Sequence, residues 1–109
     1  PRYQAAIHYL TLAPNNNHRE SQYIIGIIYY SGKYINEDIN KAINYLTHAS
    51  NNNFVNAYYA LGIIYNDKNN GVYNFEKTIH FLTLAAENNH PEAQYHLGII
   101  YSNQKQHIN

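Results

Sequence analysis

The sequence predicts an all-α fold, an α-solenoid of three helix-turn-helix units, from a repeated heptapeptide and the apolar periodicity around it. Copies of the heptapeptide occupy residues 23–29, 59–65 and 95–101, 36 residues apart, and five of seven positions are identical in all three. A period of about 20 to 50 residues is typical of repeat proteins, in which each unit packs on its neighbours. We therefore expect one domain over residues 1–109, with units at about 2–37, 38–73 and 74–109.

The first helix of each unit is predicted by apolar residues at positions i, i+3, i+4 and i+7, the core-facing stripe of an amphipathic helix. Asp38 and Asn74 precede this helix in the second and third units and are expected to cap its N-terminus. The stripe residues are Ala6, Tyr9, Leu10 and Ala13 in the first unit; Ala42, Tyr45, Leu46 and Ala49 in the second; Thr78, Phe81, Leu82 and Ala85 in the third.

An Asn-rich turn separates the two helices of each unit. Asn17, Asn53 and Asn89 occupy the same repeat position. Asn tolerates the left-handed backbone conformation that commonly follows a helix end, so we expect that conformation at these residues. In the third unit, Pro91 is expected at the first position of the second helix, where its missing N–H costs nothing.

The second helix contains the heptapeptide and is apolar around most of its circumference, which predicts burial on more than one side. Gly26, Gly62 and Gly98 lie within it. Because Gly inside a helix costs about 1 kcal/mol relative to Ala, we expect another helix backbone to cross there. The expected contacts are the Ala residues near the end of the first helix, Ala13, Ala49 and Ala85. Inheritance through duplication of one ancestral unit is the alternative explanation.

Single residues and pairs recur along the units in a fixed order. In the second unit they are Lys41-Ala42 and Tyr45, followed by Ala57, Leu61-Gly62 and Tyr65. In the third unit they are Ala85-Ala86, followed by Ala93, Leu97-Gly98 and Tyr101. This pattern resembles the Sel1-like repeat family of the tetratricopeptide-like superfamily. The resemblance implies a right-handed superhelix, lined on its concave face by the first helices, that binds other proteins. Ordinary tetratricopeptide repeats, of about 34 residues, fit less well. Thr78 departs from the usual Ala, and Asn replaces Gly in the turn.

Composition argues against several classes of function. Seven Lys and Arg residues balance seven Asp and Glu residues, so no basic surface for nucleic acid or for an electrostatic membrane anchor is expected. No apolar run is long enough to span a bilayer. The chain has no Cys, which fits a reducing compartment, and we expect a cytoplasmic location. Because it begins at Pro1 instead of Met, we expect an excerpt or a processed chain, and because residues 104–109 resemble the start of another connector, we expect it to come from a longer array.

The sequence contains no recognisable catalytic or metal-binding motif. Seven His residues are present, but no two have the spacing of a ligand pair on one helix. The glycines recur at 36 residues instead of clustering into a phosphate-binding loop. We therefore expect a protein that is not an enzyme and has no cofactor.

The function that we expect is binding, with a surface for a protein or peptide partner on the concave face. The expected contact residues, on the outward side of the first helices, are Gln4, His8, Thr11, Leu12, Asn40, Asn44, Thr47, His48, Glu76, His80, Thr83 and Leu84. Leu12 and Leu84 are the strongest candidates, since apolar groups contribute most to binding faces. A merely solvated face is the alternative for each residue.

Three hypotheses for the whole chain follow. The first is a non-catalytic scaffold or adaptor that binds another protein. The second is the regulatory or targeting arm of a longer enzyme or membrane protein, and the third is a structural spacer. In each case, three units without polar capping helices are expected to be marginally stable or to self-associate through their uncapped ends.

Overall fold

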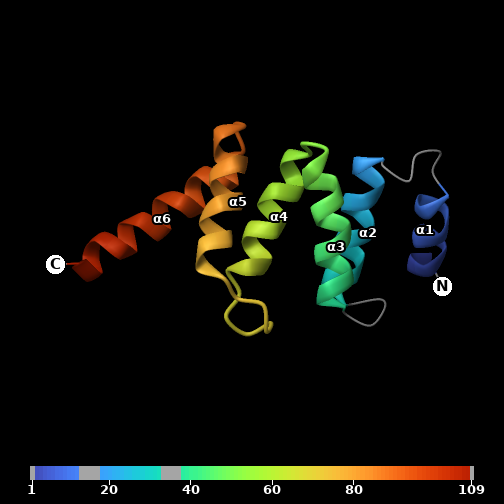
Figure 1. The fold of residues 1–109 in the computed structure, drawn as a ribbon, viewed down its shortest axis with the longest axis horizontal. Coiled ribbons are helices and arrows are strands. Elements are labelled where there is room, and N and C mark those ends of the chain that lie inside the picture. Colours follow the sequence, from blue (N-terminus) through green and yellow to red (C-terminus); the bar gives the residue numbers. More distant parts are fainter. Residues whose placement is uncertain (1, 13–17, 33–37, 109) are drawn as a thin grey trace.

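The computed structural model describes residues 2–12, 18–32 and 38–108, with side chains up to residue 104 in the last range. Six helices and no strand occur in these ranges. They are α1 (Arg2–Thr11), α2 (Arg19–Ser31), α3 (Ile39–Asn51), α4 (Val55–Tyr65), α5 (Phe75–Glu87) and α6 (Pro91–Ile108). Figure 1 shows them following one another along the long axis of a body that measures 52 × 27 × 18 Å. The predicted all-α repeat solenoid is confirmed.

The most extensive helix contacts join α2 to α3 and α4 to α5. Each of these pairs combines the second helix of one predicted unit with the first helix of the next unit. The contacts between the two helices within a unit, such as α3 with α4, are less extensive, and those of α1 with α2 are the weakest of this kind. The core therefore runs between units, as expected of a solenoid in which each unit buries its apolar surface against its neighbours.

Three of the four residues of the predicted first-helix stripe are buried in α3 and three in α5, while Tyr45 and Phe81 are partly exposed. Ala42, Leu46 and Ala49 are 0% exposed. The equivalent residues of α5 are also 0% exposed: Thr78, Leu82 and Ala85. Thr78 can occupy a buried position because its hydroxyl donates a hydrogen bond of 3.0 Å to the carbonyl of Asn74, which satisfies the polar group. In α1 no residue is buried, and Ala13 lies outside the described residues.

The predicted caps of the first helices are confirmed. The Asp38 side chain accepts a hydrogen bond of 3.0 Å from the backbone N–H of Lys41, and Asn74 does the same for Lys77. These bonds satisfy a backbone donor that the first turn of a helix leaves free. They also explain where α3 and α5 begin.

The predicted turn conformation is confirmed at Asn53 and Asn89, whose φ angles are 63° and 67°. Asn17, the third member of the set, lies outside the described residues. Pro91 is the first residue of α6, as predicted. The two His residues beside these turns have a role that sequence reasoning missed. His18 Nδ1 accepts from the Ser21 N–H at 3.1 Å, and His90 Nδ1 accepts from the Ala93 N–H at 3.2 Å, so both act as N-caps.

Gly26 and Gly62 allow a close helix crossing, as predicted, whereas a Cβ atom added to Gly98 would meet no described atom within 4 Å. The predicted contact residue was wrong. A Cβ atom added to Gly26 would lie 2.7 Å from Leu46 Cγ and 3.2 Å from the Ala42 carbonyl oxygen. A Cβ atom added to Gly62 would lie 2.7 Å from Leu82 Cδ2. The neighbour is thus a Leu of the following unit instead of an Ala near a helix end, because α2 and α4 pack most closely on the next helix along the chain.

Tyr59 joins α4 to α6. Its ring stacks on that of His90 with centroids 4.5 Å apart, and its hydroxyl lies 3.1 Å from His96 Nε2. Burial, with a further contribution from the charge of Glu92, raises the pKa of the Tyr59 phenol. A Tyr phenol is protonated at neutral pH even at its ordinary pKa, and the upward shift extends that state to higher pH, so the hydroxyl can donate a hydrogen bond to the imidazole.

Candidate partner-binding surface

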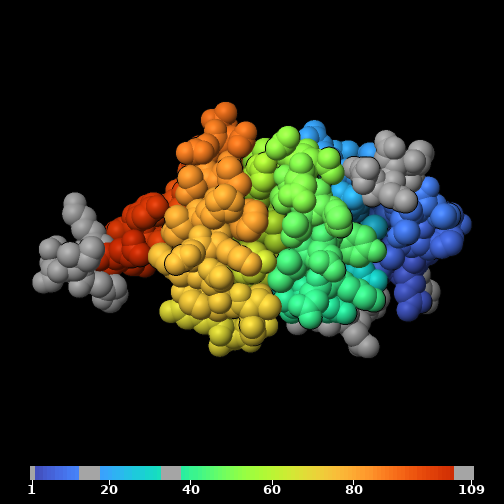
Figure 2. Space-filling model, in the orientation of Figure 1, coloured from blue at the N-terminus to red at the C-terminus, as the bar shows by residue number. Residues whose placement is uncertain are grey.

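Eleven of the twelve predicted contact residues lie on α1, α3 and α5, and Leu12 directly follows α1; these helices occupy the side of the molecule seen in Figure 2. We call this side the α1–α3–α5 face. Nine of the twelve residues are exposed and three are partly buried. The exposed residues are Gln4, His8, Thr11, Leu12, Asn40, Asn44, His48, Glu76 and His80; the partly buried ones are Thr47, Thr83 and Leu84.

The two Leu residues of this set have different environments. Leu12 is 63% exposed, whereas Leu84 packs against a core cluster that contains Leu82 and Ala85. Leu84 therefore contributes to the core as well as to the face. The Thr residues are also less available for hydrogen bonds with a partner than the sequence suggests. The Thr11 hydroxyl donates to the carbonyl of Ile7 at 2.6 Å within its own helix, and Thr47 and Thr83 are partly buried.

A hollow of about 450 Å³ opens between α2 and α3, lined by Tyr29, Lys41, Asn44, Tyr45 and His48. We call it the α2–α3 hollow. The rings of Tyr29 and Tyr45 stack with centroids 6.0 Å apart and planes within 7° of parallel. Lys41 Nζ lies 5.2 Å from the centroid of the Tyr29 ring, within the range of a cation–π interaction. The hollow thus combines two aromatic rings with a positive charge.

Sequence reasoning identified two of the five lining residues, Asn44 and His48. It assigned Tyr29 and Tyr45 to the core and did not single out Lys41 as a contact. A signal was available, because Tyr29 and Lys41 recur 36 positions later as Tyr65 and Lys77, and Tyr45 is matched by the aromatic Phe81. What the repeat cannot show is whether these aromatic residues are covered or open.

In the next unit the equivalent aromatic pair and Lys are present, but the Tyr ring is buried. Tyr65 and Phe81 stack with centroids 6.0 Å apart and planes within 10° of parallel, and Lys77 Nζ lies 5.0 Å from the Tyr65 ring centroid. Tyr65 is only 9% exposed, however, and belongs to a core cluster against which Val72 packs. The open α2–α3 hollow is therefore the better candidate for contact with a partner.

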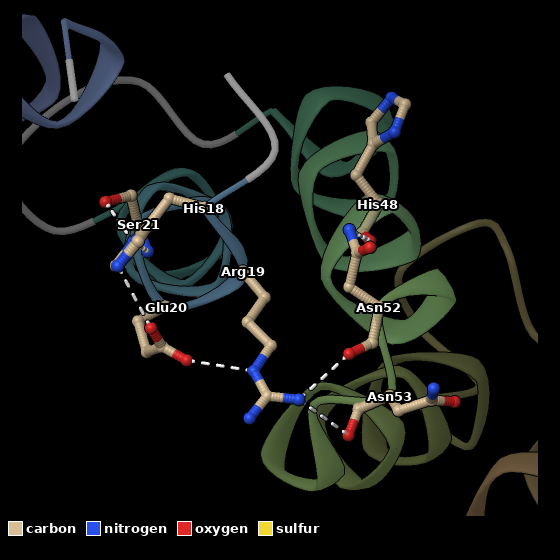
Figure 3. A network of polar contacts seen from close by, with 7 residues as sticks. All are labelled: His18, Arg19, Glu20, Ser21, His48, Asn52 and Asn53. Carbon is tan, nitrogen blue, oxygen red and sulfur yellow. Dashed lines mark hydrogen bonds and ion pairs between the residues drawn. The ribbon is translucent and has the colours of Figure 1, made fainter. Parts of the chain in front are cut away.

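A polar network fixes the end of α3 near His48 (Figure 3). Arg19, at the start of α2, donates from Nη1 to the carbonyl of Asn52 at 2.9 Å and to that of Asn53 at 3.5 Å. Its guanidinium lies 5.6 Å from the centroid of the Phe54 ring. The Asn52 side chain in turn donates to the His48 carbonyl at 3.0 Å. Arg19 thereby links α2 to the turn between α3 and α4.

We expect Arg19→Ala to lower the free energy of unfolding by about 1 kcal/mol, since it removes a charged hydrogen bond and a cation–π contact at an exposed site. Urea denaturation followed by circular dichroism measures the change. Arg2→Ala is the matched control, because Arg2 is also an exposed Arg in the first turn of a helix. Equal stability of the two variants would show that the link contributes nothing.

The described residues include no group of three or more His, Cys, Asp or Glu side chains placed to hold a metal ion. Among the described helices, none combines the length and the apolar character that crossing a membrane requires. The side chains around the hollow on the α1–α3–α5 face offer ring faces, amide and imidazole groups, and the Lys41 ammonium.

Comparison with known proteins agrees with the repeat architecture. A search of the curated proteins found no match. The sequence model described as Sel1 repeat matches residues 19–54, 55–90 and 91–106. Each of the first two matched segments begins with a second helix and includes the following first helix, so it contains one of the closely packed pairs, α2 with α3 or α4 with α5. The matches cover most of the chain, and the chain therefore belongs to the Sel1 repeat family.

Proposed function

We propose that the chain is a non-catalytic scaffold or adaptor module that binds a segment of another protein on the α1–α3–α5 face, with the α2–α3 hollow as the central contact. Sel1 repeats generally mediate interactions between proteins, and the family is generally non-catalytic. The observation that carries the more specific proposal is the open pair of stacked Tyr rings beside Lys41. We take this face to be the concave side of the solenoid.

The lining of the hollow favours a particular kind of partner segment. The ring faces of Tyr29 and Tyr45 can accept an apolar or aromatic side chain, and aromatic residues are common anchors of interfaces. The Lys41 ammonium can pair with a carboxylate. Asn44 and His48, both exposed, can form hydrogen bonds with a peptide backbone. An apolar side chain next to an acidic residue would satisfy all three features.

We expect Lys41→Glu combined with His48→Glu to abolish capture of the partner from a lysate of the source organism, and to weaken binding at least tenfold once the partner is purified. The substitutions replace the Lys41 ammonium and the His48 imidazole with carboxylates that repel an acidic segment. Affinity capture, then calorimetric titration with the captured protein, provides the measurement.

Lys77→Glu is the matched control, because Lys77 has the same repeat position beside the buried Tyr65 ring. This variant should capture the partner as the unchanged chain does. Equal loss in both variants would point to a general charge effect. Equal capture by all variants would remove the α2–α3 hollow from the binding site, and failure of the unchanged chain to capture any protein specifically would favour a structural spacer.

Two further expectations belong with this proposal. The absence of Cys supports a cytoplasmic location. The role of a regulatory or targeting arm of a longer enzyme or membrane protein would use the same face, since such an arm also acts by binding. The identity of the captured partner would distinguish that role from a free-standing adaptor.

A further inference from the structure

Histidine side chains cap two of the three second helices. His18 and His90 occupy the same repeat position, two repeats apart. Nδ1 of His18 accepts a hydrogen bond from the Ser21 N–H at 3.1 Å, and Nδ1 of His90 accepts one from the Ala93 N–H at 3.2 Å. The residue between them in the repeat, Phe54, gives α4 no side-chain cap. A ring nitrogen can accept such a bond only while it carries no proton.

Protonation of the Nδ1 atom would reverse this interaction. Imidazole side chains change charge between about pH 5 and pH 8. A protonated Nδ1 is a donor that faces another donor, and its positive charge lies at a helix N-terminus, where the macrodipole favours negative charge. Each cap therefore stabilises its helix while the imidazole is neutral, and this stability is lost as the pH falls and the imidazole gains a proton.

At the start of α2, a carboxylate offsets this loss. Nε2 of His18 lies 3.1 Å from Oε2 of Glu20 (Figure 3). The other oxygen of Glu20 accepts from Nε of Arg19 at 3.0 Å. When His18 gains a proton, its cap is lost but its attraction to Glu20 becomes that of an ion pair. The start of α2 should therefore respond only weakly to acid.

At the start of α6, the imidazole lies where three helices meet. The His90 backbone N–H donates to the carbonyl of Ala85, in α5, at 3.1 Å. The His90 ring stacks on that of Tyr59, in α4, with centroids 4.5 Å apart. The ion pairs formed by the described residues do not include His90. The cap of α6 is thus lost on protonation without a new ion pair to replace it.

The titratable groups around His90 do not change this conclusion. Tyr59 has a raised pKa, stays neutral between pH 5 and pH 8 and offers no negative charge, although its ring face attracts a protonated imidazole and offsets part of the loss. His96, whose Nε2 lies 3.1 Å from the Tyr59 hydroxyl, adds positive charge when protonated. The carboxylates of the adjoining elements are Glu87, at the end of α5, and Glu92, in the first turn of α6.

We propose that the junction of α4, α5 and α6 is acid-sensitive: protonation of His90 removes the cap of α6 and loosens the packing of this helix on α4. The start of α2 lacks this sensitivity because Glu20 compensates His18. The junction lies apart from the α2–α3 hollow, since none of these residues lines it. The proposal therefore stands or fails independently of partner binding.

Thermal unfolding followed by circular dichroism, at about pH 7.5 and about pH 5, tests this proposal. His90→Asn replaces the imidazole with an amide whose oxygen can cap the helix at both pH values. Between the two, the melting temperature of the unchanged chain should fall by about 4 °C more than that of His90→Asn, the shift that corresponds to the loss of one N-cap.

Two further variants serve as controls. His80→Asn removes an exposed imidazole of α5 that caps no helix, and it should keep the pH response of the unchanged chain. Glu20→Gln removes the carboxylate beside His18. Its melting temperature should fall more steeply with acid than that of the unchanged chain, and addition of His18→Asn should remove the difference.

Hydrogen exchange of the Ala93 amide, corrected for the intrinsic effect of pH, locates the response and needs no variant. Its protection should fall about tenfold from about pH 7.5 to about pH 5, as expected when the acceptor of this N–H is lost. Three results would overturn the proposal: constant protection of this amide, equal pH responses of the unchanged chain and His90→Asn, or a response that His80→Asn reduces as much as His90→Asn does.

Discussion

Replacing Leu82 with Ala is expected to lower the free energy of unfolding by about 2–5 kcal/mol, the range observed for buried Leu residues. Leu82 is 0% exposed and belongs to the core cluster that joins α4, α5 and α6. Its side chain also packs directly against Gly62. Because Gly has no side chain that could move into the space, the cavity left by the substitution would collapse poorly. A small domain has a total stability of about 5–15 kcal/mol, so a loss of this size would unfold a substantial fraction of the molecules on mild heating.

Urea denaturation followed by circular dichroism measures this loss, at a protein concentration low enough to keep the chain monomeric. Leu10→Ala is the matched control, because Leu10 has the same repeat position but is partly exposed. It should cost less than about 1 kcal/mol, since less apolar surface is returned to water. Similar losses in both variants would contradict the assignment of the core to the boundaries between units.

Gly62→Val is expected to lower the free energy of unfolding by about 1–3 kcal/mol through overpacking. The added Cβ would lie 2.7 Å from Leu82 Cδ2, 2.8 Å from Leu82 Cγ and 3.3 Å from the Leu82 backbone nitrogen. The side chain of Leu82 could rotate away, but its backbone could move only if α5 shifted. Val has a better helix propensity than Gly by a few tenths of a kcal/mol, which offsets only a small part of this cost.

The same substitution at Gly98 provides the control, because no described atom lies within 4 Å of the added Cβ. At low concentration Gly98→Val should be as stable as the unchanged chain or slightly more stable. The double variant Gly62→Val with Leu82→Ala examines the contact directly. Its loss should be smaller than the sum of the two single losses, since the shortened side chain makes room for the new one. Additive losses would show that Gly62 and Leu82 are not coupled.

Much of the fold follows from local chemistry that the sequence displays. Asp38 and Asn74 cap their helices because their side chains lie three residues before a free backbone N–H. Asn53 and Asn89 adopt a left-handed conformation that their side chains tolerate. The buried stripe of α3 and α5 follows from the 3.6-residue helical period. These features depend on residues within a few positions of one another, so they can be predicted without knowledge of the tertiary structure.

The candidate surface depends on which helices pack together, and residues at identical repeat positions therefore differ in environment. Gly62 faces Leu82 while Gly98 faces no described atom, and Tyr65 is 9% exposed while Tyr101 is 52% exposed. From its repeat position alone, Leu84 was expected to be exposed, but it packs against the core. Helix type and apolar pattern were thus determined by the sequence. Which apolar residues remain available for contact was decided by the tertiary structure, because burial depends on neighbours 20 or more residues away that a local pattern does not specify.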